Sequence, residues 1–211
     1  MPTITDYRAQ LRLDLMDPAG SAQRFSDADL DRAIQRAVAA YQLAAPRPAS
    51  VQLTTTPGSR ELSLVGLPDL LEVWTVEWPV GAYPRRFRRF RLSPDRLVLE
   101  LLVEGPPAKA EPVNLEYGAT HFVDTGQSTI PPEHVALLLR GAYGYACLAY
   151  GTPAADNFRY QDGAAQAEVD DTGIIGRWHT AGHTALDEFC RSLLALRCQR
   201  VQTAPQRVVW T

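Results

Sequence analysis

The sequence lacks long hydrophobic runs, paired cysteines and almost all lysine. No stretch of about 18 or more apolar residues occurs, which excludes a predicted membrane-spanning helix. The N-terminal MPTITDYRAQ has neither the basic nor the apolar region of a secretory signal, so none is expected. The three cysteines, Cys147, Cys190 and Cys198, form no C-x-x-C pair and fit a reducing compartment.

Sequence motifs of catalysis and cofactor binding are also missing. There is no G-x-S-x-G elbow, no Walker A loop and no G-x-G-x-x-G after a strand. His179 and His183 stand four apart, as in some metal sites, but no glutamate follows the first and no third ligand is evident, so we expect a polar helix start. Residues 154–172 carry five acids without a calcium-loop spacing, which indicates a broken helix or a loop. The sequence therefore predicts no catalytic residue, metal, cofactor or enzymatic activity.

Composition places the chain among ordinary globular proteins. It has 211 residues, 45% of them hydrophobic and 21% charged, with a formal net charge of −3. An acidic balance argues against a general nucleic-acid binder, which is usually basic. Because Lys109 is the only lysine, nearly all positive charge is arginine. Coding bias and bidentate interface contacts both account for that choice.

Two amphipathic helices are expected at the N-terminus. Apolar residues four apart predict a helix over 5–16, with Thr5 or Asp6 as its cap. A second helix starts in RFSDADLDRAI, where Ser26 is the expected N-cap and Asp29, three residues on, completes a capping box. Its apolar stripe continues to Tyr41, and APRPAS ends it.

From about 50 to 120 the hydrophobic period changes to two, which predicts five or six strands. The segments 51–53 and 62–64 flank Pro57-Gly58 and are expected to form a hairpin. Helices then return, one over 128–151 that Gly151 would end, and one over 176–199. Within the first of these, Gly141 and Gly144 indicate close packing against a neighbouring element.

These elements predict an α+β fold. A small helical bundle, made of the N-terminal helix pair plus two or three C-terminal helices, would carry an inserted antiparallel β module. The expected domains are residues 1–48 with 125–200 as the bundle, and 49–124 as the β module. Residues 201–211 would form a C-terminal interaction segment.

Two segments are candidate interaction sites. The run RRFRRFR has no cleanly apolar face, so we expect an edge strand that pairs with Glu72, Glu77, Glu100 or an adjacent protein. Contact with phosphate is the alternative. Its arginines form the candidate electrostatic interface: Arg85, Arg86, Arg88, Arg89 and Arg91. The second segment holds interface-prone residue types and either docks on a partner or folds back on its own domain: Arg207, Val208, Val209 and Trp210.

The segment TDYRAQLRLDLMDP…RFSDADLDRAIQRAVAAYQ resembles the N-terminus of head–tail adaptor (connector) proteins of tailed bacteriophages and prophages. The order of the later elements is similar, with a weaker residue match at 130–151. The arginine run and residues 154–172 lie outside the resemblance.

The resemblance implies a structural protein of the virion neck, present in the host cytoplasm during assembly. About twelve copies would form a ring beneath the portal protein, extend the channel for double-stranded DNA without reading its sequence, and offer a surface to the stopper or tail protein. A single chain would be monomeric before the portal templates the ring, and no membrane is involved. An arginine-rich lining would hold DNA through counterion release, so we expect the run to face protein. The alternative is a nucleic-acid-binding module built on that run.

Overall fold

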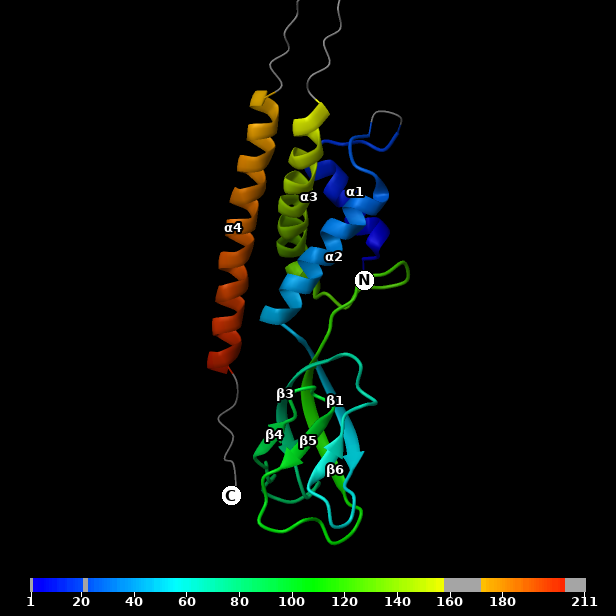
Figure 1. Ribbon diagram of the computed structural model, residues 1–211, viewed down its shortest axis with the longest axis vertical. Coiled ribbons are helices and arrows are strands. Elements are labelled where there is room, and N and C mark those ends of the chain that lie inside the picture. Colours follow the sequence, from blue (N-terminus) through cyan, green and yellow to red (C-terminus); the bar gives the residue numbers. More distant parts are fainter. Residues whose placement is uncertain (1, 21–22, 158–171, 204–211) are drawn as a thin grey trace, which may run out of the picture. The chain divides into compact units, whose positions relative to one another are not determined.

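The computed structural model describes residues 2–20, 23–157 and 172–203 and shows the predicted α+β fold (Figure 1). The chain divides into two compact units, each with its own hydrophobic core. The helical unit contains residues 1–45 and 121–201, and the β unit contains Pro46–Thr120. None of the described helices is long and apolar enough to cross a membrane.

The helical unit has four α-helices and one short 3₁₀ turn among the described residues. Its elements are α1 (Ile4–Asp14), α2 (Asp27–Ala44), η1 (Pro132–His134), α3 (Val135–Asn157) and α4 (Thr172–Thr203). In Figure 1, α3 lies between α4 on one side and α1 with α2 on the other. The bundle is therefore organised around α3.

Capping boxes begin both N-terminal helices. The Ser26 hydroxyl accepts from the backbone N–H of Asp29, whose carboxylate accepts from Ser26, as predicted for α2. The expected N-cap of α1, Thr5 or Asp6, is wrong. Thr3 is the cap, and Asp6 occupies the third helical position. Thr3-x-x-Asp6 is itself a capping-box pattern, and it starts the helix at Ile4.

An ionic network, buried at its Arg12–Asp17 pair, joins α1 to the start of α2. Arg8 binds Asp27 and Asp31 at 2.9 Å, and Arg12 binds Asp27 at 2.7 Å and Asp17 at 2.9 Å. The Arg12 and Asp17 side chains are only 9% and 1% exposed. Asp17 also accepts from the backbone N–H groups of residues 24 and 25, so every partner of this buried carboxylate is a donor.

The seam between α3 and α4 depends on glycine. A Cβ at Gly141 would lie 2.8 Å from the ring of Phe189, and one at Gly144 would lie 2.7 Å from Leu186. The close packing expected for these glycines is therefore present. Both expected helices differ in their bounds. In place of 128–151, a 3₁₀ turn begins at Pro132 and α3 ends at Asn157. In place of 176–199, α4 spans Thr172–Thr203.

The β unit consists of two three-stranded antiparallel sheets. The first has the order β1 (Arg47–Thr54), β6 (Pro112–Ala119), β3 (Leu70–Glu77). The second has the order β2 (Glu61–Ser63), β5 (Val98–Leu101), β4 (Phe90–Leu92). The expected hairpin around Pro57-Gly58 is wrong, because β1 pairs with β6 and β2 pairs with β5.

Candidate interaction surface

The arginine run lies in a loop that leaves the end of β3 and returns to the second sheet. We call residues 78–92 the arginine loop. Phe87 forms an isolated antiparallel bridge with Glu77, and only Phe90–Leu92 is a true strand, β4. β4 does lie at the edge of its sheet, as expected. The expectation of one continuous strand over the whole run is wrong, because Pro79 and Pro84 interrupt the chain before it and only short pairings follow.

Arg88 fixes the base of this loop. Its Nε donates to the backbone carbonyl of Trp78 at 2.9 Å, and its guanidinium lies 5.6 Å from the centre of the Trp78 ring. The Trp78 indole N–H donates to Glu111 at 2.9 Å. Backbone hydrogen bonds from Trp78 to Arg86 and from Arg88 to Val76 close the turn. The loop is therefore tied to β3 by main chain and side chain together.

The expected pairing with acids holds for one arginine. Arg91 donates to Glu100 on β5 through Nε at 3.0 Å and Nη2 at 2.6 Å. Glu77 instead accepts from the backbone N–H of Gly81, and Glu72 accepts from the Trp74 indole. These two carboxylates therefore accept hydrogen bonds from β3 and from the arginine loop's backbone.

Three arginines of the loop present free guanidinium groups. Arg85, Arg86 and Arg89 are exposed, and none makes an ion pair or side-chain hydrogen bond with another described residue. Tyr83, which sequence analysis did not single out, is fully exposed beside them. Tyrosine and arginine are among the residue types most enriched at the centres of protein interfaces. The loop therefore offers cations and an aromatic ring to a partner with negative charge.

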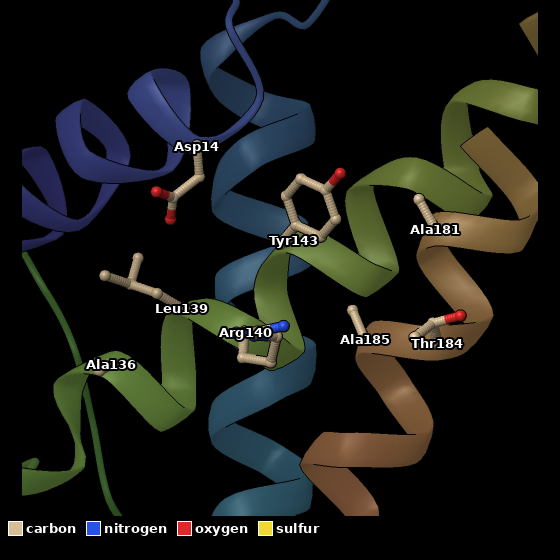
Figure 2. A pocket seen from close by; sticks show the side chains of 8 residues that line it. All are labelled: Asp14, Ala136, Leu139, Arg140, Tyr143, Ala181, Thr184 and Ala185. Atoms are coloured by element: carbon tan, nitrogen blue, oxygen red, sulfur yellow. The ribbon is translucent and has the colours of Figure 1, made fainter. Parts of the chain in front are cut away.

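A groove of about 660 Å³ crosses the helical unit (Figure 2). It lies between the end of α1, α3 and α4, and its lining is mostly small or apolar. Its charged groups are Asp14 and Arg140, and Arg140 is bound to Glu188 at 2.6 Å. Burial raises the pKa of Tyr143, which also lines the groove. Among the described residues that line the groove, no nucleophile is hydrogen-bonded to a general base.

The remaining candidates carry no site in the described part of the chain. His179 and His183 lie inside α4 with ring centres 6.4 Å apart, rather than at a helix start. Across the described residues, no three histidine, cysteine or acidic side chains gather as metal ligands. Burial raises the pKa of the Cys147 thiol to about 11, which keeps it protonated and unreactive. The tail residues Arg207, Val208, Val209 and Trp210 lie outside the described residues.

No protein-family model and no curated protein sequence matches the chain. Among solved structures, it is similar to a chain in the neck of an empty gene transfer agent particle, with 22% identity and a TM-score of 0.31 over 84% of this chain and 88% of that one. A chain in the virion of a native gene transfer agent particle gives 20% identity and a TM-score of 0.30 over the same shares. Superpositions of this quality establish neither a common fold nor a common function, so the functional proposal rests on this chain's own residues.

Proposed function

We propose that this protein is a structural component of a virion neck, a head–tail adaptor. Copies of it form a ring beneath the portal protein, extend the DNA channel and give the stopper or tail protein a surface to dock on. The protein acts by holding larger particles together and transforms no substrate.

The observation that carries the proposal is the N-terminal motif and what it builds. The residues that resemble adaptor proteins are the ones that form the ionic network of α1 and α2: Arg8, Arg12, Asp17, Asp27 and Asp31. Ser26 and Asp29 of the same motif form a capping box. The ion pairs fix α1 against the start of α2, and the capping box fixes the residue at which α2 begins. A motif whose ion pairs and capping box make structural contacts within the chain suits a scaffold.

In this role, the arginine loop would be a surface that binds a neighbouring protein. Three free guanidiniums and one exposed tyrosine suit an acidic face of a neighbouring neck protein. Arg85, Arg86 and Arg89 would set the rate and salt dependence of that encounter, while Arg88 holds the loop in shape.

Electron microscopy of the protein mixed with the portal protein of its own particle tests the proposal. We expect rings of this chain on the portal, with the portal alone as the control. A chain that stays apart from the portal at every ratio contradicts the adaptor role.

The nucleic-acid alternative is favoured by the same three unpaired arginines and has a separate test. A DNA mobility-shift assay over a salt series compares the wild type with a variant in which Arg85, Arg86 and Arg89 are alanine. We expect only weak binding, in the range of non-specific contacts of about 10⁻⁴–10⁻⁶ M. Submicromolar binding that this variant abolishes would establish the alternative.

A further inference from the structure

Among the described residues, the β unit has four sheet edges, and three of them are protected against pairing with another chain. β2 and β4 are only three residues long, and β4 carries the charged Arg91. β3 has two irregularities in its register, and the backbone N–H of Arg88 donates to its Val76 carbonyl. The Arg96 guanidinium donates to its Leu71 carbonyl at 2.9 Å. Short strands, charges and bulges are the features that keep sheet edges from pairing.

The fourth edge, β1, lacks these features. It has eight residues and pairs with β6 along its whole length without a shift in register. Apart from Arg47 at its start, it carries no charge. Pro48 lacks an N–H group and blocks only the beginning of the edge. Residues 49–54 therefore form a long, uncharged edge that is open to a further strand.

The backbone groups along this edge have no partner in the described part of the chain. Thr55 donates its N–H to the Glu111 carbonyl, on the β6 side. Because hydrogen bonds alternate along an antiparallel strand, Ser50, Gln52 and Thr54 direct their N–H and C=O groups away from β6. No described residue binds these outward N–H groups. Since unpaired backbone groups are rare inside proteins, this row faces water and can bind a strand.

The core-facing side of β1 is incompletely covered. Ala49, Val51 and Leu53 pack on the β core but are only partly buried. Their neighbours on β6, Val113 and Leu115, are fully buried. A strand added beside β1, with apolar residues on the same side, would remove more of this row from water.

We propose that β1 pairs with β1 of a second copy, antiparallel and about a two-fold axis that passes between the two Gln52 residues. In this register Ser50 of one copy lies opposite Thr54 of the other, and Gln52 lies opposite its own counterpart. Each outward N–H of these three residues then has a carbonyl partner across the contact. Pro48 falls opposite residue 56, beyond the end of the strand, so its missing N–H costs no hydrogen bond.

The side chains of β1 suit this register. On the core side Val51 lies opposite Leu53, so the apolar row continues from one copy into the next. On the exposed side, hydroxyl groups of Ser50 and Thr54 meet, and two Gln52 amides meet at the axis. No like charges stand opposite each other. The sequence of β1 therefore fits a second β1, and two three-stranded sheets become one sheet of six strands.

This contact goes beyond the adaptor role and does not depend on it. A contact with two-fold symmetry joins the same patch on both copies, whereas a ring repeats a contact between different patches. The dimer therefore describes the protein before it enters a particle. It differs from the monomer that the resemblance to adaptor proteins implies for that state.

Two variants of opposite charge test the contact at its axis. Because residue 52 lies opposite itself, Gln52→Lys and Gln52→Glu each bring like charges together. We expect the wild type to sediment as a dimer in analytical ultracentrifugation and each variant alone to sediment as a monomer. An equimolar mixture, with an affinity tag on one variant, should form a heterodimer that the tag recovers, which also shows that both variants fold. A wild type that stays monomeric over its soluble range overturns the proposal, and so does a mixture that fails to pair.

Ser63→Lys is the matched control, because Ser63 is exposed on the short edge strand β2. This variant should remain a dimer like the wild type. If it dissociated as Gln52→Lys does, the effect would come from charge in general and the assignment to β1 would be wrong.

Disulfide formation gives a direct readout of the register. In a background with Cys190 and Cys198 replaced by serine, Gln52→Cys should form a linked dimer under mild oxidation. Opposite residues of a hydrogen-bonded antiparallel pair have Cα atoms about 5.5 Å apart, which a disulfide spans without strain. Ser63→Cys in the same background should stay unlinked. A dimer that does not link through position 52 overturns the proposed pairing.

Discussion

Arg12 and Asp17 show how one buried ion pair secures the start of the fold. Replacing a buried charge leaves its partner without compensation, which typically costs about 3–5 kcal/mol. Arg12→Ala would strand the carboxylate of Asp17, which is 1% exposed. We therefore expect a loss of about that size in the free energy of unfolding, measured by urea denaturation.

The matched control for Arg12 is Arg32 on α2. Arg32 is 68% exposed and lies 4.0 Å from Asp29. Exposed pairs of this kind contribute between about 0 and 1 kcal/mol. Equal losses from Arg32→Ala and Arg12→Ala would show that the network does not hold α1 in place.

Tyr41 gives the helical unit a dependence on alkaline pH. Burial raises the pKa of Tyr41 to about 12, and its hydroxyl lies 2.6 Å from Nδ1 of His134. Because the folded pKa is above the unfolded value, folding favours the neutral phenol. This contribution is fully present below about pH 10 and is lost as the pH rises toward 12.

Ultraviolet titration of the tyrosines tests that expectation. Tyr41→Phe should remove a phenol that ionises late in the titration, because burial raises the pKa of Tyr41 to about 12. The loss of stability above pH 10 should be shallower in Tyr41→Phe than in the wild type. If Tyr41→Phe removed an early part of the titration curve instead, the burial argument would be contradicted.

At the scale of elements, the packing of α3 on α4 depends on the absence of a side chain. Gly141→Ala would place a methyl group 2.8 Å from the ring of Phe189, which is fully buried. Overpacking of this kind costs about 1–3 kcal/mol, more than the alanine gains in helix propensity. We expect lower stability in thermal unfolding.

Gly176 provides the control within the same pair of helices. It lies in α4, and a Cβ there would meet nothing within 4 Å. Gly176→Ala should leave stability unchanged or raise it by up to about 1 kcal/mol through helix propensity alone. A gain from Gly141→Ala as well would mean that the two helices move apart freely.

Local chemistry was readable in the sequence, and long-range pairing was not. The capping box at Ser26 and the close packing of Gly141 and Gly144 were predicted because each signal consists of two residues three apart. The residues that the glycines contact, on α4, were not predicted. The Thr3 cap of α1 was missed, although Thr3-x-x-Asp6 is a capping-box pattern like Ser26-x-x-Asp29. Thr3 lies two residues before Thr5, the first of the two caps that were expected. The hairpin failed because β1 pairs with β6, some sixty residues away, and Pro57-Gly58 only makes a turn.

The sequence predicted which arginines form the candidate surface, but not which of them are bound within the chain. Charge placed Arg85 and its neighbours at an edge, which holds for β4. The sequence could not show that Arg88 and Arg91 are bound within the chain while Arg85, Arg86 and Arg89 are free. That division depends on where Trp78 and Glu100 lie in the fold.

At the scale of the whole molecule, two separate hydrophobic cores predict that the two units unfold independently. The helical core and the β core share no residue. Leu30 in α2 and Leu115 in β6 are both fully buried, each in its own core. Leu-to-Ala changes in cores cost about 2–5 kcal/mol.

Native-state hydrogen exchange of the two alanine variants tests this independence. Leu115→Ala should speed exchange of amides in β1, β3 and β6, and leave α2 and α3 as protected as in the wild type. Leu30→Ala should produce the reverse pattern. If either change lowered protection equally in both units, the chain would unfold as one cooperative body. Independent unfolding would suit the proposed adaptor role, because a load that opened one unit would leave the surfaces of the other intact.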